Sequence, residues 1–123
     1  METKEKFSVK KRVQSFRHAF NGLGKFFRTE HNAWIHGVAA IIVLILGWRL
    51  HISKREWLGV CFVIGLVLSA EAFNTCIERL ADIVSPAADD RVKYIKDLAA
   101  GAVLMAAITA AITGLIIFVP KIF

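Results

Sequence analysis

One long uncharged run constrains the fold of this chain more than any other feature. Residues 98–119 contain no charged side chain, and as an α-helix these twenty-two residues would extend roughly 33 Å. That length is sufficient to cross the hydrocarbon core of a bilayer. Pro120 follows directly and is expected to end the helix, because proline has no backbone N–H to donate. The sequence therefore predicts a transmembrane helix that ends with this run.

Two more apolar segments lie earlier in the chain, separated by a short polar turn. The first has Trp34 and Trp48 near its ends, where indole rings suit the two membrane interfaces. The second begins at Trp57 and ends where Ser85-Pro86 interrupts the helical pattern. Its two cysteines are fifteen residues apart, roughly 22 Å along a helix, and are expected to be buried free thiols rather than a disulfide.

The composition supports a membrane location for all three segments. Of the 123 residues, 56% are hydrophobic and 21% are charged, an apolar excess that a soluble domain of this size could not bury. We therefore predict an all-α membrane protein of one domain, with an interfacial helix followed by three transmembrane helices. The expected interfacial helix covers residues 8–28, and the expected transmembrane helices cover residues 33–50, 57–84 and 92–119.

The interfacial helix is predicted from its spacing and charge. Apolar residues recur every three or four positions, at Val9, Val13, Phe16, Phe20, Leu23 and Phe27. This periodicity indicates an amphipathic helix lying in the plane of the membrane interface. Eight basic residues precede the first apolar segment and contribute to a net charge of +6. Such a block could bind nucleic acid, but beside apolar helices it favours a cytoplasmic N-terminus on anionic lipid, with no nucleic-acid partner.

An acidic stripe in the second apolar segment is the most informative motif. Successive residues of an α-helix are 100° apart. At this spacing, one side of the helix, about a third of its circumference, carries Glu71, Asn74, Thr75, Glu78 and Asp82. Carboxylates at membrane depth are costly, so they usually face a bundle interior, a cavity or an ion. The stripe therefore predicts a functional site. Its structural alternative is ion pairing with Arg79 or Lys96.

The residue types in and near the stripe suit phosphoryl transfer. Carboxylates bind Mg²⁺ through oxygen, and one of them can take a proton from a hydroxyl. Glu30 would lie at the same interface as Glu78, where the two could share a metal or Glu30 could be an ordinary interfacial charge. Lys93 and Lys96 offer cations for phosphates, although they could equally be snorkelling interfacial lysines. The histidines form no zinc spacing, and no P-loop is present in the sequence.

Two ordered motifs carry a resemblance to a known family. Residues 71–82 (EAFNTCIERLAD) and 93–104 (KYIKDLAAGAVL) closely resemble the signature of the prokaryotic diacylglycerol kinase family, which includes undecaprenol kinases. The amphipathic N-terminal helix and the three membrane helices also fit that family. The resemblance implies a homotrimer with active sites shared between protomers, ATP as phosphoryl donor and Mg²⁺ as cofactor.

The resemblance also implies roles for individual residues. Glu71 resembles the general base for the lipid hydroxyl, and Asn74 a polar residue that supports it; these two are the expected catalytic residues. Glu30 and Glu78 resemble the Mg²⁺ ligands. ATP binding is implied for Lys11, His18, Glu30, Glu78, Asp89, Lys96 and Asp97. Contact with the lipid substrate is implied for Lys11, Ser15, Glu71 and Ala100.

Four positions depart from the family pattern. His18 stands where an aromatic residue is common, Trp34 where many undecaprenol-type members have Arg, and Asp89-Asp90 where many have His. The stretch from Glu30 to His36 nevertheless resembles undecaprenol kinases more than diacylglycerol-specific members.

The resemblance thus implies an ATP- and Mg²⁺-dependent lipid kinase of the bacterial cytoplasmic (inner) membrane. Its expected acceptor is undecaprenol, followed by diacylglycerol, and its product is a lipid phosphate for recycling into phospholipid or cell-envelope synthesis. Two other classes remain open on the residues alone. One is a small proton- or cation-coupled transporter that uses a buried Glu71, and the other is a structural helical subunit.

Overall fold

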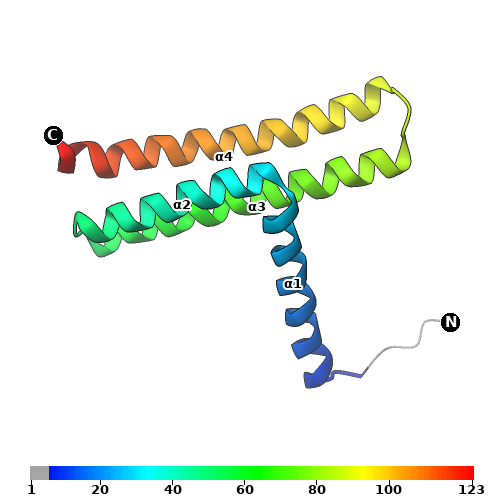
Figure 1. Cartoon of the computed structure of the whole chain (residues 1–123), viewed down its shortest axis with the longest axis horizontal. Coiled ribbons are helices and arrows are strands. Elements are labelled where there is room, and N and C mark those ends of the chain that lie inside the picture. The colour runs from blue at the N-terminus through cyan, green and yellow to red at the C-terminus, as the bar shows by residue number, and fades with distance from the viewer. Residues whose placement is uncertain (1–5) are drawn as a thin grey trace.

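The computed structural model describes residues 6–123 and confirms the all-helical prediction. Its described part consists of four α-helices without strands: α1 (Val9–Thr29), α2 (His31–Arg49), α3 (Lys54–Val84) and α4 (Asp90–Ile122). Helices α2, α3 and α4 run side by side, whereas α1 leads away from them at a steep angle (Figure 1). The three aligned helices are each long and apolar enough to cross a membrane.

Helix α1 begins at a side-chain cap and remains continuous to Thr29. The Ser8 hydroxyl accepts a hydrogen bond from the backbone N–H of Lys11, which satisfies one of the free donors of the first turn. The apolar stripe of α1, including Phe16 and Phe20, is exposed in the single chain. Only near its end does the helix bury a side chain, Phe26, beside the start of α2. An exposed apolar stripe next to membrane-length helices suits an interfacial location.

Two helix boundaries differ from the sequence prediction for identifiable reasons. Helix α3 begins at Lys54 rather than at residue 57, because Ser53 and Glu56 form a reciprocal capping box. Helix α4 continues past Pro120 to Ile122, so the expectation that this proline ends the helix was wrong. A proline in the last turn removes only its own N–H donor, and the N–H of Phe123 still bonds to the carbonyl of Val119.

Packing among the aligned helices is centred on α3. Helix α3 packs most extensively against α4 and less extensively against α2. At the end where α2 turns into α3, a buried apolar cluster unites the three helices and contains Ile52, Val60, Ile117 and Phe118. The turn itself is tight, since His51 adopts a left-handed φ of 52°. This cluster fixes the position of α3, which carries the acidic stripe, relative to α2 and α4.

Most of the large apolar side chains elsewhere lie on the outer surface of the single chain. Their number is expected for helices whose surroundings are lipid tails or other membrane helices rather than water. Cys61 and Cys76 are free thiols, as predicted, but both are exposed on this outer surface, so their expected burial was wrong. They lie on the outward side of α3, and an apolar sequence context alone does not indicate which side of a helix faces inward.

Candidate functional site

The two buried polar side chains among the described residues both belong to the acidic stripe of α3. Glu71 is 3% exposed and Asn74 is 5% exposed, one helical turn apart. Their burial follows from the same periodicity that buries Val60, Val63 and Val67 on α3. The prediction that this side of the helix faces the bundle interior is therefore confirmed for these two residues. A buried carboxylate needs a partner or a function to offset its loss of hydration.

The partner of Glu71 comes from a neighbouring helix. The Nε2 atom of His36 on α2 lies 3.7 Å from the Oε2 atom of Glu71. This distance is longer than a hydrogen bond, so the imidazole and the carboxylate are close neighbours without a direct hydrogen bond. Sequence reasoning implied ATP binding for His18 but did not assign His36 to the site. The signal that could have found it is an imidazole inside an otherwise apolar membrane segment.

Asn74 connects the buried part of the stripe to Glu78. Its Nδ2 atom donates a hydrogen bond of 3.4 Å to Oε1 of Glu78. Its Oδ1 atom is buried and has no hydrogen-bond partner among the described residues. An unpartnered buried acceptor is costly, and it can be satisfied by a donor or a cation supplied from outside the chain. The carboxylate of Glu78 and this amide oxygen are the kind of oxygen ligands that Mg²⁺ prefers.

Glu30 lies at the junction of α1 and α2 and forms an ion pair with Arg79 on α3. The pair brings Glu30 beside the residue that follows Glu78 in sequence. Within residues 6–123, no group of three His, Cys, Asp or Glu side chains is close enough to hold a metal ion by itself. This arrangement still fits Mg²⁺, which proteins commonly bind through one or two carboxylates together with substrate phosphates.

The α3–α4 end of the molecule is polar and partly hollow. A depression of about 340 Å³ is lined by Asp82, by Lys93 and Lys96, and by the connecting loop. Lys96 forms an ion pair with Asp82. Lys93 forms a second ion pair with Asp97, with 2.6 Å between Nζ and Oδ2. The structural alternative for the stripe is thus realised at Asp82, which pairs with Lys96, whereas Arg79 pairs with Glu30 outside the stripe. Neither of them pairs with Glu71.

Asp89 is the N-cap residue that precedes α4 and has a well-defined structural role. Its carboxylate accepts hydrogen bonds from the side chain and the backbone N–H of Arg91. These bonds, the side-chain bond first, hold the pKa of Asp89 below its ordinary value. The carboxylate also caps the helix N-terminus, where a negative charge is favourable.

The remaining predicted residues lie apart from Glu71 within one chain. Lys11, Ser15 and His18 belong to the part of α1 that leads away from the bundle (Figure 1). The Ser15 hydroxyl bonds to the carbonyl of Lys11. Ala100 is exposed on α4, one residue after the buried Ala99. A single chain therefore brings together Glu71, Asn74 and Glu78 but does not add the α1 residues to them.

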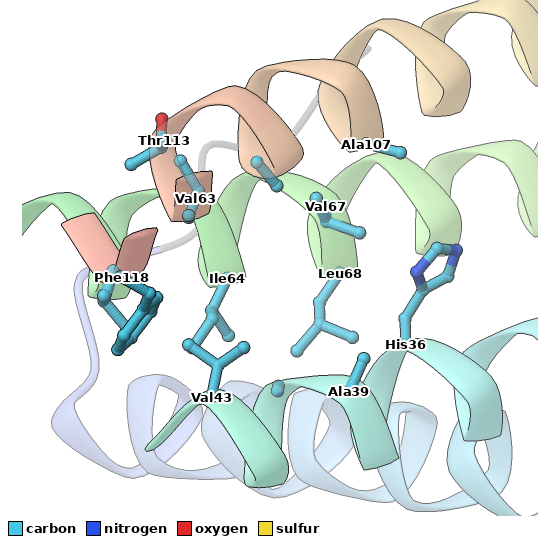
Figure 2. Close-up of a pocket in the computed structure, with 14 residues that line it drawn as sticks. His36, Ala39, Val43, Val63, Ile64, Val67, Leu68, Ala107, Thr113 and Phe118 are labelled. Atoms are coloured by element: carbon cyan, nitrogen blue, oxygen red, sulfur yellow. The ribbon is translucent and has the colours of Figure 1, made fainter. Parts of the chain in front are cut away.

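An apolar cavity of about 230 Å³ lies between α2, α3 and α4. Figure 2 shows His36 at one end of it and Phe118 at the other, with Val43, Ile64 and Leu68 along its walls. The cavity thus extends from His36, which lies beside Glu71, to the apolar cluster at the α2–α3 turn.

Comparison with known proteins adds independent information. The model of the family described as "Prokaryotic diacylglycerol kinase" matches residues 17–118. The undecaprenol kinase of Bacillus subtilis (strain 168) is 40% identical over 109 residues, which cover 89% of this chain and 89% of that protein. The diacylglycerol kinase of Synechocystis sp. (strain ATCC 27184 / PCC 6803 / Kazusa) is 34% identical over 109 residues. Those residues cover 88% of this chain and 62% of that protein.

Proposed function

The chain belongs to the prokaryotic diacylglycerol kinase family, and we propose that it transfers the γ-phosphoryl group of MgATP to the primary hydroxyl of a membrane lipid. Family membership makes it a lipid kinase, a phosphotransferase with an alcohol acceptor. The donor, the metal and the acceptor belong to the proposal. The observation that carries it is the buried carboxylate of Glu71, on a membrane-length helix, one turn from Asn74 and two turns from Glu78.

Glu71 is proposed as the general base. Its carboxylate takes the proton from the lipid hydroxyl while the hydroxyl oxygen forms a bond to the γ-phosphorus of ATP. The bond between that phosphorus and the bridging oxygen breaks, and ADP leaves with the bonding electrons. Because Glu71 is 3% exposed, water has little access to the reacting oxygen, which favours transfer to lipid over hydrolysis. Asn74 supports this site by keeping Glu78 in place.

Glu78 and Glu30 are proposed as the Mg²⁺ ligands. Mg²⁺ bound there would neutralise negative charge on the ATP phosphates. Support comes from the unpartnered Oδ1 atom of Asn74 beside Glu78, and from the position of Glu30 beside Arg79. In the single chain, Arg79 neutralises Glu30.

The polar depression at the α3–α4 end is the proposed nucleotide site. Lys96 would exchange its ion pair with Asp82 for the ATP phosphates, which carry more negative charge. Asp97 and Asp89 lie at the same end of the molecule, where Asp97 pairs with Lys93 and Asp89 caps α4. This site would adjoin Glu78 on the preceding turns of α3.

A homotrimer is proposed because one chain leaves its predicted site incomplete. Lys11, Ser15 and His18 lie on the part of α1 that leads away from Glu71. A neighbouring protomer could place its α1 against the α3 and α4 of the first chain, bringing phosphate and lipid ligands to Glu71 and Ala100. The exposed apolar surfaces of α2 to α4 would supply contacts between protomers and with the bilayer.

The proposed location is the bacterial cytoplasmic membrane, with the N-terminus and the α3–α4 loop on the cytoplasmic side, where ATP is available. The basic residues of α1 support this orientation. Undecaprenol is the first choice of acceptor because the undecaprenol kinase is the more similar of the two relatives, at 40% against 34% identity. Diacylglycerol is the second choice. The relatives do not favour the alternative of a transporter.

A competition experiment tests the proposed acceptor. The purified protein in mixed micelles would receive undecaprenol and diacylglycerol together, with ATP labelled at the γ-phosphate and with Mg²⁺ present or chelated. We expect labelled undecaprenyl phosphate in excess of labelled phosphatidic acid, and neither product after chelation. Preferential labelling of diacylglycerol would reverse the order of acceptors, and equal labelling in the chelated sample would contradict the role of Mg²⁺.

A further inference from the structure

The contact between His36 and Glu71 is the one feature of the buried site that the roles proposed above do not use. Glu71 belongs to α3 and His36 belongs to α2, so the contact joins two helices at the point of the proposed chemistry. Within residues 6–123, His36 is the polar side chain that lies beside the Glu71 carboxylate, with Nε2 at 3.7 Å from Oε2. Asn74, the other buried polar residue, is engaged with Glu78 instead.

The surroundings of His36 give its ring a defined orientation. His36 lines the cavity near Ala39 and Leu68, whose side chains offer no hydrogen-bond partner, while the hydroxyl of Thr113 lies toward the opposite end (Figure 2). The ring nitrogen Nε2 lies 3.7 Å from the carboxylate of Glu71. A polar ring edge is more stable toward a carboxylate than toward an apolar cavity, so the imidazole has a physical reason to keep facing Glu71.

The position of His36 is itself fixed by the junction of α1 and α2. The next residue, Gly37, packs against Phe27 of α1, since a Cβ atom at Gly37 would lie 3.5 Å from the Phe27 ring. Phe27 in turn contacts the buried Phe26, edge to face. The start of α2 is thus held in place from one side, and His36 faces Glu71 from there.

We propose that His36 is a positioning residue for the lipid kinase reaction, in which its Nε2–H attracts the Glu71 carboxylate and holds it in the orientation that accepts the hydroxyl proton. This inference rests on the proposed role of Glu71 as general base. It names a residue on α2 that acts through Glu71 without touching the reacting atoms. A general base works only within hydrogen-bond reach of its proton, so a small rotation of the Glu71 side chain is enough to slow the reaction.

Two substitutions at the same position separate positioning from general structural support. In His36→Gln, the side-chain amide nitrogen can occupy the place of Nε2, whereas in His36→Asn the shorter side chain places it near Nδ1, out of reach of Glu71. Both are neutral, polar and compatible with a helix. His51→Asn is the matched control, because His51 is exposed in the α2–α3 turn and Asn tolerates its positive φ.

Lipid phosphorylation should be measured at saturating lipid with varied MgATP, per folded protein judged by circular dichroism in micelles. We expect kcat to fall roughly 10–100-fold in His36→Asn, with the KM for MgATP within about twofold of wild type. His36→Gln should recover kcat to within about threefold of wild type, and His51→Asn should match it. In a Glu71→Gln background, His36→Asn should lower the remaining activity by less than about twofold, because the two residues act as one unit.

Three outcomes would overturn the proposal. First, His36→Asn could retain the kcat of wild type. Second, the kcat of His36→Gln could fall as far as that of His36→Asn. Third, His36→Asn could lower kcat in the Glu71→Gln background by the same factor as in wild type. Each would show that His36 does not act through Nε2 on Glu71. A failure of the proposed function is distinguishable, since wild type itself would then phosphorylate no lipid.

Discussion

The two halves of the aligned helices differ in what they bury. The half next to the α2–α3 turn buries only apolar side chains, with Val60 1% exposed against Ile117 and Phe118. The half next to the α3–α4 loop buries Glu71 and Asn74 and leaves an acceptor atom of Asn74 without a partner. We call them the turn half and the loop half; they lie at opposite ends of the bundle (Figure 1).

This difference separates stability from chemistry. Close apolar packing stabilises a helix bundle even between membrane helices, where the hydrophobic effect is absent and contacts must be tight. Buried polar groups with incomplete partners cost free energy and are therefore retained where a substrate or ion completes them. The turn half should accordingly determine resistance to unfolding, and the loop half should determine catalysis. Substitutions in each half should change one property without the other.

The largest expected effect is that of Glu71→Gln. This isosteric change removes the proton acceptor and keeps the volume of the side chain, so kcat for lipid phosphorylation should fall by roughly 10²–10⁴-fold. The thermal unfolding of the protein in micelles should stay close to that of wild type, because a buried carboxylate is replaced by a neutral amide. Retention of more than a tenth of the wild-type kcat would contradict the assignment of Glu71 as the base.

The second prediction concerns the proposed Mg²⁺ ligands of the loop half. Glu78→Gln should raise the Mg²⁺ concentration needed for half-maximal activity by roughly 10–100-fold, because one anionic oxygen ligand is lost. The matched control is Glu56→Gln at the opposite end of α3, where Glu56 pairs with Lys121 and closes the capping box. The Mg²⁺ titration of Glu56→Gln should coincide with that of wild type. If the Mg²⁺ concentration for half-maximal activity rose equally in both variants, Glu78 would not be a Mg²⁺ ligand.

The third prediction tests the turn half, where over-packing should lower stability without changing catalysis. A Cβ atom at Gly47 would lie 3.0 Å from both Ile52 and the Trp57 ring, so Gly47→Val should destabilise the fold by about 1–3 kcal/mol. Gly65→Val is the control, because a Cβ atom there would meet nothing within 4 Å apart from its chain neighbours and the backbone of its own helix. Unfolding in micelles should shift for Gly47→Val alone, while the kcat of the folded fraction stays unchanged. A lower kcat in the folded fraction would mean that the two halves are coupled.

The smallest expected effect is on the cap of α4. Asp89→Ala removes the hydrogen bonds to Arg91 and should lower the melting temperature slightly at neutral pH. Because these bonds hold the pKa of Asp89 below the ordinary value of 3.8, the stabilisation is present above that value and is lost as the pH falls through the lowered pKa. The difference in melting temperature between the two proteins should therefore disappear in strongly acidic buffer. A difference that persists there would assign the effect to something other than the carboxylate.

Much of the fold could be predicted from the sequence because its signals are local. Apolar run length and helical periodicity indicated all four helices and the inward side of α3 at Glu71 and Asn74. The earlier start of α3 was also readable, since Ser53 and Glu56 have the spacing of a capping box. The continuation of α4 through Pro120 depends on the position of the proline within the last turn, which cannot be known before the helix end is known.

The partners of the site residues could not be predicted, because they depend on how helices are placed against one another. The contact of His36 with Glu71 joins residues of α2 and α3, and that of Glu30 with Arg79 joins the α1–α2 junction to α3. Neither pair has a sequence spacing that points to contact. The roles of Lys11, Ser15 and His18 stay predictions, since a single chain does not bring α1 to Glu71.

The most direct test of the account is a single-turnover transfer experiment with excess folded protein in micelles. ATP labelled at the γ-phosphate would be mixed with undecaprenol in the presence of Mg²⁺, and the label would be followed in lipid phosphate, free phosphate and ATP. The account predicts that label moves to lipid phosphate in wild type and stays in ATP in Glu71→Gln. Label that appears only as free phosphate, or equally fast in the lipid with Glu71→Gln, would contradict a lipid kinase that uses Glu71 as its base.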